Sequence, residues 1–115
     1  MNKDKMELLI ILKTYGDKLI SSIMKTSEYF QSYDEASGSE QMISIIDSLQ
    51  WFIDEAVSCS VLCEKDDLIN INNKFKEIVE AFENQDYVLI GDLMQYELLP
   101  IIVYINNNIT NYVNS

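Results

Sequence analysis

Asp92 and Glu97 stand within residues 84–100, a stretch with apolar residues in nearly every direction that a helix can point. Carboxylates on helices build di-metal centres, but those centres also use a Glu-x-x-His pair from each of two helices. The chain contains no histidine, and only Asp92 and Glu97 are expected to point inward. We therefore expect no metal ion and no cofactor.

The thiols and hydroxyls of the chain lack a base that would activate them. Cys59 and Cys63 stand four residues apart in a helical pattern, so they share one face rather than forming a CxxC redox turn. Without histidine, no cysteine or serine has the usual activating partner. The glycines are scattered and form no phosphate-binding loop. The sequence thus predicts a protein that is not an enzyme and whose cysteines are buried and structural.

The charge balance narrows the class of partner. Asp and Glu number 19 against 8 basic residues, which are all lysine, for a formal charge of -11. This charge repels nucleic-acid phosphate and anionic membrane surfaces. No stretch approaches the roughly 20 apolar residues of a transmembrane helix, and no signal-peptide pattern is present. We expect a cytoplasmic protein that binds neither nucleic acid nor membrane.

Apolar residues recur at steps of three and four along the chain, which is the spacing of helical stripes. The first stripe consists of Leu9, Leu12, Gly16, Leu19, Ile23, Thr26 and Phe30. The second consists of Met42, Ile45, Leu49, Phe52, Ala56, Cys59 and Cys63. The third consists of Leu68, Ile71, Phe75, Ile78 and Phe82, and a fourth helix is expected from Tyr87 toward Asn111. Gly16 indicates either close approach of a neighbouring helix or a break.

Small polar and acidic residues mark the boundaries between these helices. We expect the first loop at residues 33–40, with Ser37 and Glu40 as an S-x-x-E cap. A second turn is expected at 63–67, with Asp66 or Asp67 as the cap, and Asp86 is expected to cap the fourth helix. Four helices with short loops predict an all-α fold, an antiparallel up-down four-helix bundle in a single domain over residues 1–115.

The fourth helix carries more apolar surface than one stripe requires. A bundle helix usually hides an arc of about 100° or a little more, whereas here Leu89 and Leu93 lie on one line and Ile90 and Met94 on another. We expect residues 84–100 to be covered twice, once by the bundle and once by another chain. The alternative is a helix seated deeply in a monomer.

Five residues of this helix are candidates for partner binding: Tyr87, Asp92, Tyr96, Glu97 and Pro100. The two carboxylates would need hydrogen bonds at the junction, because an unpaired buried charge is too costly to keep. Tyr87, Tyr96 or a lysine could donate those bonds. Pro100 cannot donate to the carbonyl of Tyr96, and its ring crowds that turn, so we expect a kink there.

Trp51 is a further candidate for partner binding, on the second helix. It lies about 100° from the stripe of its helix, near Ser44, Ser48 and Glu55, and is therefore expected to be partly exposed. It either packs at the edge of the bundle or anchors an interface, since Trp and Tyr are enriched where binding energy concentrates.

The segment ENQDYVLIGDLMQYELLPII, taken with SLQWFIDEA earlier, resembles a family of small uncharacterised all-helical proteins from spore-forming Firmicutes. In that family the pattern N-x-DY-x-L-x-x-DL-x-x-YEL-x-P ends the domain. The matching residues are Asn84, Asp86, Tyr87, Leu89, Asp92, Leu93, Tyr96, Glu97, Leu98 and Pro100. Members look like neighbours of flagellar genes. Size, acidity and helical build are also similar to flagellar export chaperones, whose diagnostic motifs are absent here.

These observations favour a non-enzymatic protein that binds another protein chain, as an adaptor or chaperone with a link to flagellar assembly. It would act through the fourth helix and the face of Trp51. One alternative is a structural homodimer in which two fourth helices cover each other. A toxin-neutralising immunity protein would explain the acidity equally well.

Overall fold

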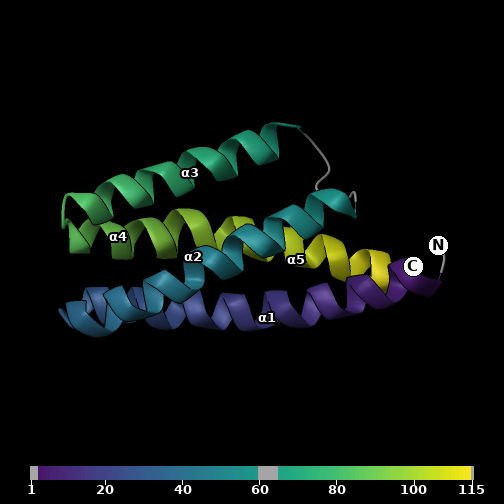
Figure 1. Cartoon of the computed structure of the whole chain (residues 1–115), viewed down its shortest axis with the longest axis horizontal. Coiled ribbons are helices and arrows are strands. Elements are labelled where there is room, and N and C mark those ends of the chain that lie inside the picture. The colour runs from purple at the N-terminus through teal and green to yellow at the C-terminus, as the bar shows by residue number, and fades with distance from the viewer. Residues whose placement is uncertain (1–2, 60–64, 115) are drawn as a thin grey trace.

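The computed structural model describes residues 3–59 and 65–114, which form helices joined by short turns (Figure 1). Three long helices come first: α1 (Lys3–Gln31), α2 (Glu35–Ser58) and α3 (Lys65–Glu83). The fourth helical run has three parts, α4 (Tyr87–Leu93), the π-helical turn η1 (Met94–Leu98) and α5 (Leu99–Asn114). The described residues contain no strand, and the all-α prediction is confirmed.

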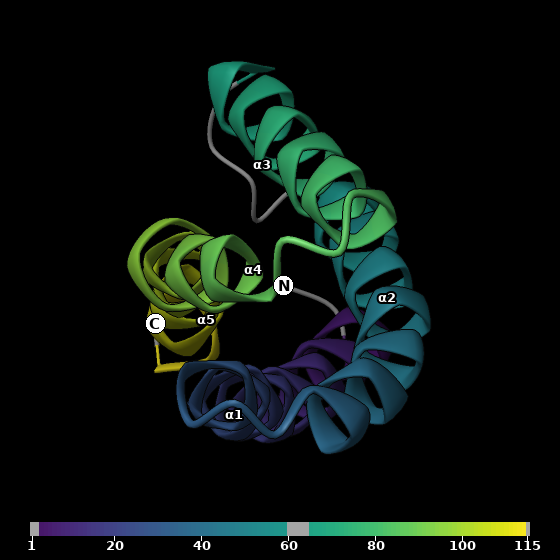
Figure 2. The ribbon, with the colours of Figure 1, turned by 90° about the vertical axis from the view of Figure 1, so that its left-hand side faces the viewer.

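Helix α1 is the centre of the assembly. It packs against α2 and also against α4, η1 and α5. Helix α2 and the run from α4 to α5 flank α1 on different sides (Figure 2). Every residue of its predicted stripe is buried, and the helix is continuous through Gly16. The stripe of α2 is buried from Met42 to Cys59, whereas Cys63 lies outside the described residues.

Gly16 allows the close approach of α1 and its neighbours that the sequence indicated. A side chain at this position would place its Cβ 2.8 Å from Cγ of Asn106 on α5 and 2.9 Å from the Phe52 ring on α2. Asn106 is itself buried, and its Nδ2 donates to Oδ1 of Asp17 at 2.7 Å. Gly16 is thus the point at which three helices meet. The close packing that it permits offsets its poor helix propensity.

The C-terminal end of α1 forms a second close contact, around Phe30. A Cβ at Gly38 of α2 would lie 2.8 Å from the Phe30 ring, and one at Gly91 of α4 would lie 3.2 Å from its Cβ. Tyr87 stacks on the same ring, with the centroids 5.9 Å apart and the planes at 8°. Ser27 donates to the carbonyl of Gly91 at 2.9 Å. Two glycines therefore bring α2 and α4 close to α1 at this end.

The first turn is shorter than predicted. We expected a loop at residues 33–40, but α2 already begins at Glu35, and Ser37 and Glu40 lie inside it. The N-cap is Asp34, whose side chain accepts from the backbone N–H of Ser37 at 3.2 Å. Ser, Asp and Gly in one short stretch all suit a helix start, and the earliest of them takes the role.

The turn between α3 and α4 also ends in an aspartate that caps the following helix. Asp86 caps α4 as predicted, accepting from the N–H of Leu89 at 3.4 Å. In both turns the residue before the capping Asp adopts a left-handed conformation, with φ of 65° at Tyr33 and 56° at Gln85. Asp66 and Asp67, proposed as caps of α3, lie within its first turn.

Helix α3 is held mainly from one side. Its principal neighbours are α4 and η1, and it diverges from the other helices toward its N-terminal end (Figure 1). Of its predicted stripe, Ile71 and Ile78 are buried, whereas Leu68, Phe75 and Phe82 are partly buried against the core. The spacing therefore predicted the inward face correctly, but fewer neighbours cover it than cover α1.

Candidate functional site

The fourth helical run presents a row of exposed residues to solvent. Residues four apart lie on one face of a helix, and five residues at this spacing are all exposed: Val88, Asp92, Tyr96, Pro100 and Tyr104. We call these five residues the exposed row. The opposite side of the run is packed in the core. Deep seating of the whole run is therefore wrong, because Val88 is 54% and Tyr96 67% exposed.

The π-helical turn η1 sits in the middle of the exposed row. The N–H of Leu99 donates to the carbonyl of Met94, five residues back, which widens the turn just before Pro100. We predicted a kink at Pro100; the structure places a π-helical turn directly before this residue, and the helix continues through it as α5. In an α-helix of about 3.6 residues per turn, residues four apart drift gradually around the axis. The wider π turn offsets part of this drift, so Tyr96 and Pro100 stay on the same side as Val88.

The two carboxylates were expected to point inward, and for Asp92 this is wrong. Asp92 lies in the exposed row, because the side of the run that faces solvent is the side on which it stands. Glu97 lies between surface and core, and its Oε1 accepts from Nζ of Lys74 at 2.9 Å. A lysine was one of the donors expected for it. Lys74 also contacts Glu77 at 3.6 Å, so this cation links α3 to η1.

This ion pair raises the pKa of its cation. The hydrogen bond that Lys74 donates to Glu97 raises the pKa of Lys74 above its ordinary value. Partial desolvation lowers this pKa, and the nearby charge of Glu77 raises it. Lys74 therefore stays charged, and it holds η1 against α3 with a charge-assisted hydrogen bond.

A groove runs between α3 and α4, beside the exposed row. Its lining residues are Glu77, Glu80, Ala81, Asn84, Asp86, Leu89 and Leu93. We call this the α3–α4 groove. Its volume is about 240 Å³, which is below the roughly 300 to 1,000 Å³ of small-molecule sites. It combines an apolar floor, including Leu89 at 42% exposure, with three carboxylates at its rim.

Tyr87 and Trp51, the remaining candidates, lie apart from the exposed row. Tyr87 is half-buried in its stack on Phe30, which is a structural contact. Trp51 is 38% exposed and packs on Tyr15 of α1, with the ring centroids 4.5 Å apart. Because α2 and the α4–α5 run lie on different sides of α1 (Figure 2), the structure splits the candidates into two surfaces.

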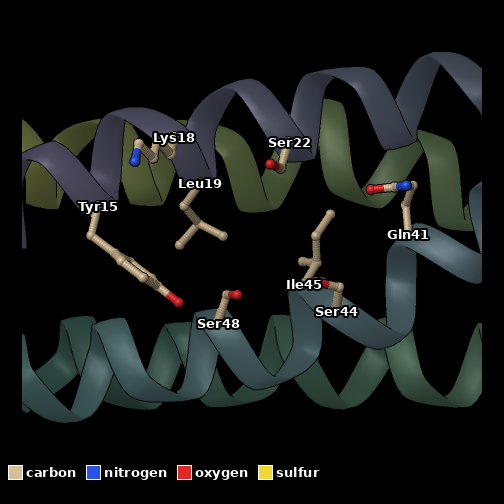
Figure 3. Close-up of a pocket in the computed structure, with 8 residues that line it drawn as sticks. All are labelled: Tyr15, Lys18, Leu19, Ser22, Gln41, Ser44, Ile45 and Ser48. Carbon is tan, nitrogen blue, oxygen red and sulfur yellow. The ribbon is translucent and has the colours of Figure 1, made fainter.

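The sequence reasoning missed a polar pocket next to Tyr15. It has a volume of about 210 Å³ and is lined by Tyr15, Lys18, Leu19, Ser22, Gln41, Ser44, Ile45 and Ser48. Tyr15 and Leu19 from α1 point toward Ser48 and Ile45 from α2 (Figure 3). The feature of the sequence that could have indicated this pocket is the set of serines at helical spacing near Trp51. Its hydroxyls have no histidine or carboxylate beside them among the lining residues, so the pocket offers polar contacts rather than an activated nucleophile.

Cys59 behaves as the sequence predicted. It is buried, with 4% of its surface exposed. Burial raises the pKa of its thiol, the charge of Glu55 raises it further, and Lys5 opposes these effects. A thiol with a raised pKa is a poor nucleophile. In the described part of the chain, no group of three or more His, Cys, Asp and Glu residues is arranged to hold a metal ion.

The fourth run also corrects an expectation about membranes. We expected no segment of transmembrane length, yet Tyr87–Asn114 is long and apolar enough by length and composition. Core helices of soluble proteins meet the same criterion, and here the inner side of the run packs against α1 and α3. The finding is therefore weak evidence for a membrane span.

Comparison with known proteins identifies the family. No curated protein and no solved structure shows a significant match to the chain. Residues 7–108 match a family model described as Domain of unknown function (DUF8042). Because this match covers most of the 115 residues, the chain belongs to the DUF8042 family.

Proposed function

We propose that this chain is a non-enzymatic, cytoplasmic protein that binds another protein chain, as an adaptor or chaperone. The exposed row carries the proposal. Val88, Tyr96 and Tyr104 are 54%, 67% and 46% exposed, and they follow one line on a helix whose other side is packed. Tyrosine on an interface supplies a large contact area and a hydroxyl, and it is enriched among residues that dominate binding energy. A line of anchors at four-residue spacing is the pattern by which helices pack against helices.

A role in flagellar assembly is the more specific form of this proposal. It rests on the resemblance of residues 84–100 to a motif in helical proteins of spore-forming Firmicutes. Asp92, Tyr96 and Pro100 belong both to that motif and to the exposed row. This overlap supports a binding role for these residues, since none of the three side chains fills the core.

Site-specific photo-cross-linking in the native cell tests the proposal. A photoreactive residue at position 96 is compared with one at position 43, because Tyr96 and Ile43 are both 67% exposed and lie on different helices. We expect a discrete heavier adduct from position 96 and none from position 43. Mass spectrometry then identifies the captured chain. Absence of an adduct at position 96, or equal adducts at both positions, contradicts the proposal.

The mass of the adduct separates the adaptor from the homodimer. An adduct with a second copy of this chain favours a structural homodimer in which two fourth helices cover each other. An adduct with one different protein favours the adaptor, and a flagellar protein in it favours the flagellar form. Size exclusion with light scattering gives an independent measure, because the adaptor is expected to be a monomer when purified alone.

A further inference from the structure

We propose that the partner of this surface is a cationic amphipathic helix of a different protein, seated along the α3–α4 groove with its apolar side on the exposed row. This inference rests on the proposed function and names the class of partner. It is carried by the charges that surround the groove, by the apolar side chains that it leaves exposed, and by the distribution of lysine along the chain.

Of the carboxylates that line the groove, Glu77 is paired with Lys74, and three others beside the groove form no ion pair with the described lysines. Glu80 and Asp86 line the groove, and Asp92 stands next to it in the exposed row. Among the residues that the structure describes, Lys13 and Lys74 form ion pairs, and neither lysine pairs with any of these three carboxylates. A partner that carries lysine or arginine would find three acidic acceptors around one apolar depression.

The apolar part of the same surface is a depression that can receive side chains of a partner. Leu89 is 42% exposed in the groove, and Val88 is 54% exposed beside it. Ala81 and Leu93 are buried beneath them. A depression of about 240 Å³ receives apolar side chains from one face of a helix, while the acidic rim contacts the charged residues that flank that face.

A second copy of this chain is the wrong occupant. Residues 87–114 contain no lysine or arginine, whereas they contain Asp92 and Glu97. A two-fold interface brings the same patch of both copies together, so two fourth runs would place acidic residues against acidic residues with no cation between them. Each copy also carries a formal charge of -11, which opposes association. A contact between two fourth runs therefore supplies no cation, which favours a different protein as the occupant.

Synthetic peptides test the charge requirement. The probe is a fluorescein-labelled helical peptide with leucines spaced three and four apart and lysines on the remaining positions. The matched peptide has glutamate in place of every lysine. By fluorescence anisotropy, we expect saturable one-site binding of the lysine peptide that weakens as salt is raised, and no binding of the glutamate peptide. No binding of the lysine peptide, or equal binding of both, overturns the inference.

Paired variants test the location. Glu80→Gln with Asp92→Asn removes two charges beside the groove and should weaken the lysine peptide by about two- to five-fold per charge. Glu40→Gln with Asp47→Asn removes the same charge from exposed positions of α2 and should leave the affinity unchanged. Leu89→Ser should also weaken binding, with an unchanged circular-dichroism spectrum. If both double variants lost the same affinity, binding would depend on the net charge of the protein rather than on the groove. This result would overturn the inference.

The two proposals fail in different ways. A cross-link from position 96 to a different protein whose contact segment lacks lysine and arginine leaves the proposed function standing and overturns the cationic helix. Absence of any cross-link from position 96 overturns both. A dimer by light scattering that Asp92→Asn strengthens identifies a second copy as the occupant, which overturns the inference in favour of the homodimer.

Discussion

Helices α1 and α3 are both long and amphipathic, yet their surroundings differ. The stripe of α1 is packed by α2 on one side and by the α4–α5 run on the other, and Leu9, Leu12 and Ile23 have no exposed surface. α3 packs mainly on α4 and η1, so Leu68, Phe75 and Phe82 stay partly exposed. An amphipathic pattern therefore determines which face turns inward, whereas the number of neighbours determines how completely that face is covered.

The difference assigns separate roles to the two helices. Full burial on two sides makes α1 the element on which global stability depends. α3 is attached through partly buried side chains and the Lys74–Glu97 ion pair, so it can open at lower free-energy cost. Since α3 forms one wall of the α3–α4 groove, the less stable helix is also the one that borders the proposed binding surface. Amide hydrogen exchange should be faster in α3 than in α1.

The largest expected effect compares one substitution on the two helices. Phe30 is 1% exposed between α1, α2 and α4, so Phe30→Ala should lower the free energy of unfolding by about 3 to 5 kcal/mol. Phe75 on α3 is partly buried, and Phe75→Ala should cost about 1 to 2 kcal/mol because less apolar surface is lost. Denaturant unfolding measures both. Equal losses would mean that α3 is held as firmly as α1.

Overpacking of α1 is the next effect in size. Gly16→Ala adds a methyl group where the nearest ring atom of Phe52 is 2.9 Å away, and overpacking of this kind costs about 1 to 3 kcal/mol. The gain of about 1 kcal/mol in helix propensity offsets part of this loss. Ser21→Ala, at an exposed position of the same helix, is the control and should not destabilise the protein. A thermal melt that rises for Gly16→Ala would contradict the close contact.

Substitutions in the turns before α2 and α4 are expected to raise the free energy of unfolding. Tyr33 is 78% exposed and left-handed, with φ at 65°, a conformation that glycine adopts without strain. Tyr33→Gly should therefore raise the free energy of unfolding by about 0.5 to 1 kcal/mol. Gln85→Gly in the turn before α4 should have a similar effect. A loss of stability in either variant would show that the replaced side chain makes a contact that the turn requires.

A smaller effect concerns the attachment of α3 and depends on pH. Because the Glu97 hydrogen bond raises the folded-state pKa of Lys74, its contribution to stability is complete below the unfolded pKa of about 10.4 and is lost as pH rises through the folded pKa. The melting temperatures of the parent protein and Lys74→Gln should converge in that alkaline range. Lys76→Gln, at an exposed position of the same helix, should show no such convergence.

The smallest effect on stability is expected in the exposed row. Tyr96→Ser removes a ring that is 67% exposed, so the free energy of unfolding should change by no more than about 0.5 kcal/mol. The same variant should weaken binding of the lysine peptide. A large loss of stability would mean that Tyr96 belongs to the core, and an unchanged affinity would remove it from the binding surface.

Much of the fold was predictable because it follows from local periodicity. The stripe of α1 was correct at every position, and Asp86 was correctly identified as a cap, since both depend on residues within a few positions of one another. The cap of α2 was misplaced because several capping residue types compete between Asp34 and Ser39, and their ranking depends on packing of the neighbouring helix. The orientation of Asp92 was misjudged for a related reason: the fourth run is apolar on so many sides that its pattern does not reveal which side faces out.

The sequence by itself determined the helical class, the inward stripe of α1, the inward faces of α2 and α3, the burial of Cys59 and the need for a hydrogen-bond donor to Glu97. Tertiary structure alone decided which side of the fourth run stays uncovered, that a π-helical turn accommodates Pro100, and that Trp51 lies on a different surface from Tyr96. The physical reason is that periodicity is a property of one helix. Exposure depends on where neighbouring helices cross it, and those crossings are set by contacts between residues far apart in the chain, such as Gly16 with Asn106 and Phe30 with Gly91.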